Sequence, residues 1–189
     1  MNSPRSTVVR KIIPLLIILF VIVGLRMFAF TTYYLGADDS VRLKGLEPHT
    51  LLFISRMTGD ISVSDDLIYR DPLIPTGPGR RTLVSLGRCV ALPGSLVKLS
   101  DGTDLPSPLR GDEISIDSTT LEVFLPLLLL EMGEKVGDIS HDTAVKLRTL
   151  RKHRVSQDYY LIHTVDGAYI WLSRKDIEGR VIGALCSPF

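Results

Sequence analysis

An apolar segment near the N-terminus constrains this chain more than any other feature of its sequence. Residues 12–30 are almost all apolar and are interrupted only by Gly24 and Arg26. As a helix they would extend about 28 Å, close to the hydrocarbon core of a bilayer, which is about 30 Å thick. The sequence therefore predicts one N-terminal transmembrane helix, with the anchor placed over residues 12–35.

The charges on either side of this segment predict its orientation. Basic residues stand before it at positions 5, 10 and 11, and acidic residues follow it at positions 38 and 39. Because basic residues are retained on the cytoplasmic side, we expect residues 1–11 in the cytoplasm and residues 36–189 in an extracytoplasmic domain at the cell membrane. A cleaved signal peptide is the alternative, since residues 12–25 alone match the length of its apolar region.

Length, charge and composition limit the remaining classes. The 189 residues, of which 45% are hydrophobic, suit one modest domain with a packed core. A formal net charge of +1 does not attract nucleic acid, so we expect no nucleic-acid partner. The histidines lack metal-ligand spacing, and we expect no metal and no cofactor. Cys89 and Cys186 either pair outside the cytoplasm or are small buried side chains.

After the apolar segment, short β-rich stretches alternate with turn residues, which favours an antiparallel β domain. We expect strands at residues 50–55, 67–70, 82–86 or 88–92, 96–99, 158–163, 168–172 and 178–185. Pro93-Gly94 is expected to close one hairpin-like unit, and Asp166-Gly167 to close another.

Residues 100–155 interrupt this pattern. The spacing of Thr119 and Glu122 predicts a capping box, followed by a short helix over residues 121–130 that Pro126 would bend. A buried apolar strand is the alternative. A basic run at residues 146–154 is typical of a solvated face. The predicted fold class is thus mainly β, with one transmembrane helix and a small helical insertion.

Two segments carry a resemblance to a known family. Residues 44–51 read Lys-Gly-Leu-Glu-Pro-His-Thr-Leu, and residues 87–95 read Gly-Arg-Cys-Val-Ala-Leu-Pro-Gly-Ser. They resemble the type I signal peptidases, membrane-anchored serine proteases that typically carry Gly-x-Ser-Met-x-Pro-Thr-Leu and Lys-Arg-x-x-Gly-x-Pro-Gly-Asp. Residues 110–114, 157–161 and 177–183 follow in family order. The resemblance implies an antiparallel β fold whose groove takes substrate as an added strand.

The resemblance also shows what is missing. It places Gly45 at the position of the nucleophilic serine and Gly87 at that of the general-base lysine, so the chain is similar to a degenerate member without the Ser-Lys dyad. Leu43 stands where many members have an oxyanion-binding serine, and residues 163–168 replace the loop that orients the lysine. The candidate groove residues are Leu43, Gly45, Leu46, Glu47, Pro48, Arg88, Pro93 and Gly94.

Three functions are consistent with these residues. The first is an inactive signal-peptidase-like protein that binds exported peptides or subunits, as an accessory or chaperone in secretion or surface assembly. The second is an active peptidase with a displaced dyad, in which His49, His163 and Asp166 imitate a triad with Ser55, or Lys44 serves as the base. The third is an unrelated anchored β scaffold domain.

Overall fold

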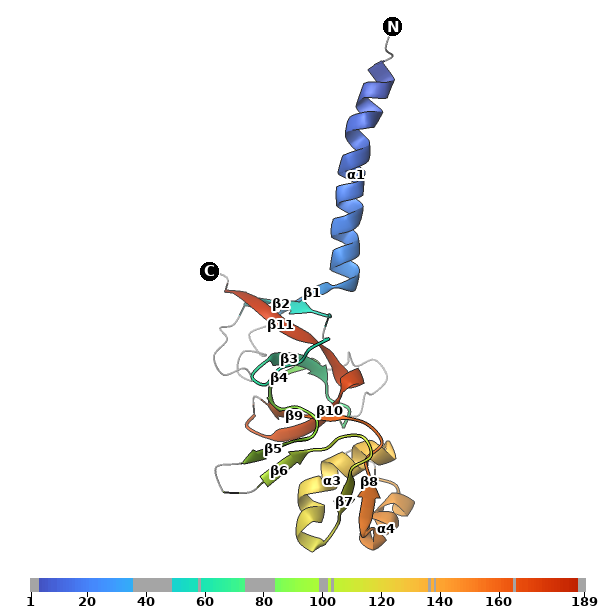
Figure 1. Cartoon of the computed structure of the whole chain (residues 1–189), viewed down its shortest axis with the longest axis vertical. Helices are drawn as coiled ribbons and strands as arrows, with labels where there is room; N and C mark the ends of the chain where they lie inside the picture. The colour runs from blue at the N-terminus through green and yellow to red at the C-terminus, as the bar shows by residue number, and fades with distance from the viewer. Residues whose placement is uncertain are drawn as a thin grey trace.

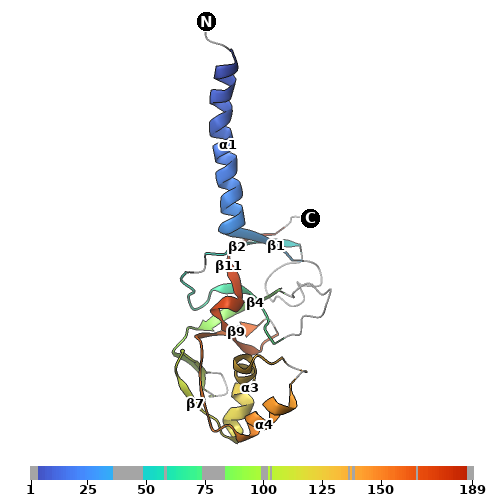
Figure 2. The same cartoon turned by 90° about the vertical axis from the view of Figure 1, so that its right-hand side faces the viewer.

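The computed structural model shows a β body with helix α1 standing away from it at one end (Figure 1). Two further helices, α3 and α4, lie at the opposite end of the body, and a second view agrees (Figure 2). The structure describes residues 4–35, 49–57, 59–73, 84–98, 102, 104–135, 137, 139–164 and 166–186.

The predicted transmembrane helix is wrong. Helix α1 spans Pro4–Phe28, but among the described residues no helix is both long enough and apolar enough to cross a membrane. Helix α1 ends at Phe28, and Phe30–Tyr34, which falls within the range predicted for the anchor, forms strand β1.

A seven-stranded antiparallel sheet forms the body. Its strands are β1, β2 (Thr50–Ser55), β3 (Asp66–Arg70), β4 (Val84–Ala91), β9 (Tyr159–Thr164), β10 (Tyr169–Ser173) and β11 (Ile177–Cys186). Their spatial order is β1-β2-β11-β3-β4-β9-β10. Strand β11 is thus last in the described chain but lies between β2 and β3. Two register shifts, one before Gly179 and one before Gly183, mark bulges in it.

The hairpin predicted at Asp166-Gly167 is confirmed by the pairing of β9 with β10. Gly167 has a φ of +84°, which glycine adopts without steric cost, and its N–H donates to the Thr164 carbonyl at 3.0 Å. The two alternative strands predicted at residues 82–92 are one continuous strand, β4.

The hairpin-like unit predicted around Pro93-Gly94 is wrong. Strand β5 (Ser95–Lys98) follows this turn but pairs with β6 (Asp104–Ser107), not with β4. The N–H of Gly94 donates to the carbonyl of Ser107 at 2.6 Å, so the turn directs the chain toward β6. A second small sheet pairs β7 (Glu113–Ser115) with β8 (Lys152–Arg154).

The insertion contains two helices, α3 (Ser118–Met132) and α4 (His141–Thr149). The predicted helix is confirmed and is longer than expected, with Pro126 inside it. The predicted capping box is wrong: Asp117 Oδ1 accepts from the N–H of Thr120 at 2.7 Å, and Thr120 Oγ1 accepts from the N–H of Asp117 at 2.7 Å. The box starts earlier because these two side chains satisfy the first free N–H groups of the helix.

The core has three parts. The largest joins α3 to β9 and β10 and contains Phe124, Leu127, Leu161 and Trp171. A second lies on the face of the sheet that carries Cys89, which is free and fully buried. A third joins Leu35 to β2 and β3. The helical insertion therefore packs against one end of the sheet, away from α1 (Figure 2).

Candidate functional site

The structure describes three of the eight predicted groove residues, together with the predicted base position. Leu43, Gly45, Leu46, Glu47 and Pro48 lie outside the described residues, as does Lys44. Gly87, Arg88, Pro93 and Gly94 are described, and they lie along β4 and the turn that follows it.

Gly87, the predicted base position, lies inside the sheet. It pairs with Leu67 of β3 on one side and with Thr164 of β9 on the other. A Cβ added here would lie 2.5 Å from Ile162 Cγ2, 3.0 Å from the His163 carbonyl oxygen and 3.2 Å from Tyr69 Cε1. These distances are shorter than ordinary carbon contacts, so no side chain fits without displacing a neighbour. The space for a side chain at the position predicted for the general base is therefore filled by the core.

The titratable groups on this face of β4 do not replace the lysine. Burial, with the charge of Asp71, raises the pKa of the Tyr69 hydroxyl, while a hydrogen bond with Ser85 lowers it in part. Burial, with the charge of Asp65, raises the pKa of the Cys89 thiol to about 11. Both groups are protonated and neutral at neutral pH, so neither supplies a base there.

Unlike Gly87, Arg88 and Gly94 do not lie in the core of the sheet. Arg88 is exposed, and its Nε donates to Asp66 Oδ1 on the neighbouring strand at 2.8 Å. Gly94 lies in the turn after β4 with a φ of +83°, and a Cβ there would lie 2.8 Å from Leu109 Cδ1. Gly87, Arg88 and Gly94 therefore lie in three different environments.

The structure does not assemble the displaced triad. Three strands lie between Ser55 on β2 and His163 on β9, a separation of about 19 Å along the sheet. His49 precedes β2, whereas Ser55 ends it, and the His49 Nδ1 lies 2.6 Å from the Tyr34 hydroxyl. His163 packs against Tyr169, with ring centroids 4.9 Å apart.

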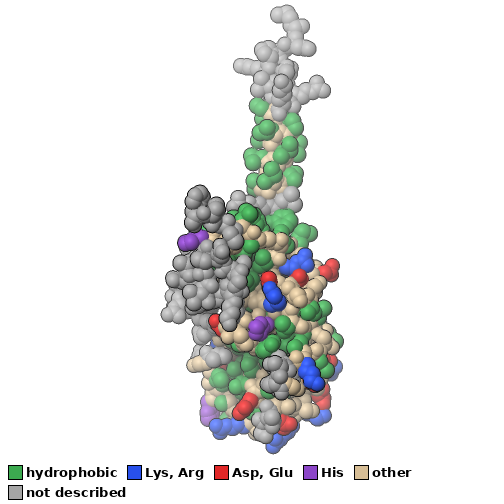
Figure 3. Space-filling view, turned by 90° about the vertical axis from the view of Figure 1, so that its left-hand side faces the viewer, with side chains coloured by type: hydrophobic (Ala, Val, Ile, Leu, Met, Phe, Trp, Pro, Cys, Tyr) green, Lys and Arg blue, Asp and Glu red, His purple; other side chains and the backbone are tan. Residues whose placement is uncertain are grey.

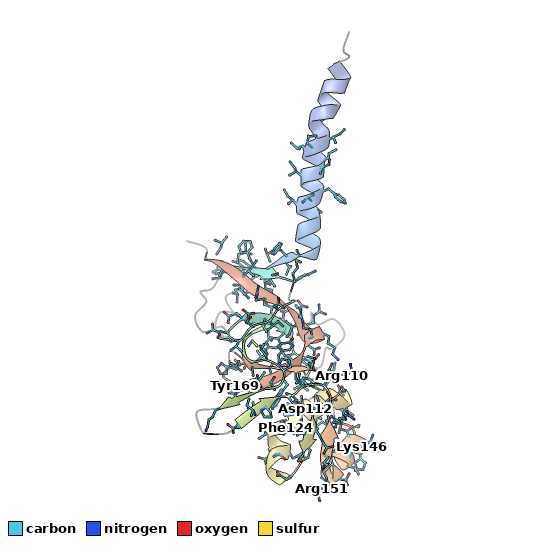
Figure 4. All side chains as sticks on the ribbon, in the orientation of Figure 1. Arg110, Asp112, Phe124, Lys146, Arg151 and Tyr169 are labelled. Atoms are coloured by element: carbon cyan, nitrogen blue, oxygen red, sulfur yellow. The ribbon has the colours of Figure 1, made fainter. Side chains whose placement is uncertain are left out.

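A cavity of about 350 Å³ lies beside Gly94, between the β5–β6 sheet, β7 and α3. Its lining residues are Gly94, Ser95, Leu96, Pro106, Ser107, Pro108, Asp112, Glu113, Ile114 and Phe124. Figure 4 labels Asp112 and Phe124 in this part of the molecule. Of the groove residues that the structure describes, Gly94 lines it, whereas Arg88 and Pro93 do not. The other lining residues were missed because no local pattern shows that three separate segments meet here.

No metal site is found in the described ranges, where no group of three or more His, Cys, Asp or Glu side chains could hold an ion. The comparisons with known proteins give no family either: no family model, curated protein or solved structure matches this chain.

Proposed function

We propose that this chain is a signal-peptidase-like protein without peptidase activity, which binds exported peptides or subunits as an accessory or chaperone in secretion or surface assembly. One observation carries the inactive part of this proposal. The position that the resemblance assigns to the general base is a glycine whose Cβ space is taken by Ile162 and Tyr69. A lysine amine has no room there, and a serine without a base is a poor nucleophile.

Binding needs no catalytic side chain, because an extended peptide can add to an exposed strand through main-chain hydrogen bonds. In the part of the chain that the structure describes, β1 and β5 each pair with a neighbour on one side only. Both strands carry exposed side chains, including Tyr34 on β1 and Leu96 on β5, which is 69% exposed. These edges support the capture of an extended segment.

A membrane is the second proposed partner, with the β body on its extracytoplasmic side. The described apolar side chains of α1 are exposed: Ile12, Ile13, Leu15, Leu16, Ile17, Ile18, Leu19, Phe20, Val21, Ile22 and Val23. Figure 3 shows apolar side chains, in green, on the visible face of the helix where it projects from the body. Contact with lipid would remove this apolar surface from water, which is favourable. The proposal therefore places binding of exported peptides close to a membrane surface.

A precursor-processing experiment tests the proposal. The detergent-solubilised full chain is incubated with an exported precursor that a control signal peptidase cleaves, and binding of a fluorescent signal-like peptide is followed by anisotropy. We expect saturable binding and no cleavage product. Cleavage would contradict the inactive assignment and favour a displaced dyad. Absence of both cleavage and binding would favour an unrelated scaffold domain.

A further inference from the structure

We infer that the cavity beside Gly94 binds a lysine or arginine side chain of an extended peptide that pairs with β5. This inference rests on the proposed peptide binding and adds the chemical class of side chain that is selected. The site joins an apolar wall, an acidic rim and an available strand edge.

The walls of the cavity suit an aliphatic stem. Leu96 and Pro106 are register partners on β5 and β6, so their side chains lie on the same face of this small sheet. Ile114 and Phe124 line the cavity from β7 and α3, and both are buried, whereas Leu96 is 69% exposed. The lining of the cavity thus combines buried apolar side chains with one exposed leucine. The methylene groups of lysine or arginine pack well on such surfaces.

The polar residues of the cavity favour a cation. Asp112 and Glu113 are exposed carboxylates, and the described residues that line the cavity include no basic side chain. Glu113 accepts from the Lys152 ammonium at 2.5 Å, so its charge is already balanced within the protein, and Asp112 is the lining carboxylate left to meet a cation. Asp112 Oδ2 accepts from the N–H of Leu109 at 2.8 Å, which holds its carboxylate in place. A neutral or acidic peptide side chain would gain less here than a basic one.

Strand β5 provides the main-chain partner. Its only ladder in the described chain is with β6, and Ser95 and Leu96, at its beginning, line the cavity. A peptide added to β5 would send alternate side chains to the face that carries Leu96. One of them would reach the cavity, while the main chain of the peptide supplies affinity that does not depend on sequence.

Two fluorescent peptides test this inference. They are eight-residue strand-forming sequences that differ only in a central lysine or norleucine, which have similar aliphatic stems. Anisotropy titration against the full chain in detergent is expected to show the lysine peptide binding about three- to tenfold more tightly. Asp112→Asn should remove most of this preference, because asparagine keeps an acceptor for Leu109 but loses the charge. Leu96→Ser should weaken both peptides.

Matched variants control for effects elsewhere. Asp104→Asn removes an exposed charge at the start of β6, outside the cavity lining, and Val63→Ser removes an exposed apolar side chain far along the chain. Both should bind like the wild type. Equal binding of the two peptides would overturn the basic-side-chain site but leave the proposed function standing. A lysine preference that survives Asp112→Asn would also overturn it. Binding of neither peptide would overturn both proposals.

Discussion

Gly87 and Gly94 belong to the same family-like segment, yet they lie in opposite environments. Gly87 is an interior residue of the seven-stranded sheet, and three atoms from β3 and β9 occupy the space of its missing side chain. Gly94 lies in a turn, has a positive φ and borders a cavity of about 350 Å³. The comparison shows that Gly87 is enclosed by the core of the sheet, whereas Gly94 lies in a turn at the border of a cavity.

The largest effect is expected from restoring the missing base. Gly87→Lys should lower the free energy of unfolding by about 3–5 kcal/mol, because it forces a long cationic side chain into a packed core. Gly87→Ala, which adds only the Cβ, should cost about 1–3 kcal/mol. Urea unfolding can be followed by the fluorescence of Trp171, the single tryptophan.

Gly59→Ala is the control for these variants, since nothing lies within 4 Å of a Cβ at that position. It should change stability by less than about 0.5 kcal/mol. If the Gly87→Lys variant were as stable as the wild type and its amine titrated, the core around Gly87 would have room for a side chain. Gly87 and Gly94 would then not differ as described above.

A smaller effect is expected at the open position. Gly94→Ala should lower the free energy of unfolding by about 1–2 kcal/mol, because an alanine is strained at a φ of +83°. Gly102→Ala has a similar φ of +86° with nothing within 4 Å, so it measures the backbone strain alone. The difference between the two variants reports the contact with Leu109, a partly exposed side chain that can move aside. If Gly94→Ala costs more than Gly87→Lys, the assignment of closed and open regions is reversed.

The smallest effect on stability is expected when the reactivity of two thiols is compared. One is the native Cys89 near Gly87, and the other is introduced at Leu96 beside the cavity. Cys89 lies on the same face of β4 as Gly87 and is fully buried. Its raised pKa of about 11 leaves very little thiolate at pH 8, so alkylation by iodoacetamide should be slow and should accelerate toward pH 11. A Leu96→Cys thiol should react rapidly at pH 8. Both rates are measured by mass spectrometry in a Cys186→Ser background, and fast labelling of Cys89 would show that its core is open.

Local patterns in the sequence predicted local structure well. The Asp166-Gly167 hairpin, the helix predicted over residues 121–130 and the strands predicted from β-rich stretches all depend on neighbours in the chain. The position of the cap was missed because two overlapping boxes are possible, and the structure shows the reciprocal bonds between Asp117 and Thr120.

Non-local features could not be predicted from the same patterns. Gly87 looks like an ordinary substitution until Ile162 and Tyr69, from distant segments, are placed over it. The turn at Pro93-Gly94 was expected to return the chain along β4, because Pro-Gly is typical of hairpins. Its direction is set by Ser107, on a strand later in the chain. The cavity likewise needs β5, β7 and α3 together.

The position of β11 has a consequence for how the molecule assembles. It joins the pair β1-β2 to the group β3-β4-β9-β10, and no other strand of the described sheet connects them. A chain emerging from the ribosome therefore makes the two parts of its sheet before the strand that unites them. Contacts that close such long loops form slowly. Until β11 docks, the facing edges of β2 and β3 stay available to other chains, which makes the newly synthesised protein itself a candidate for chaperone protection.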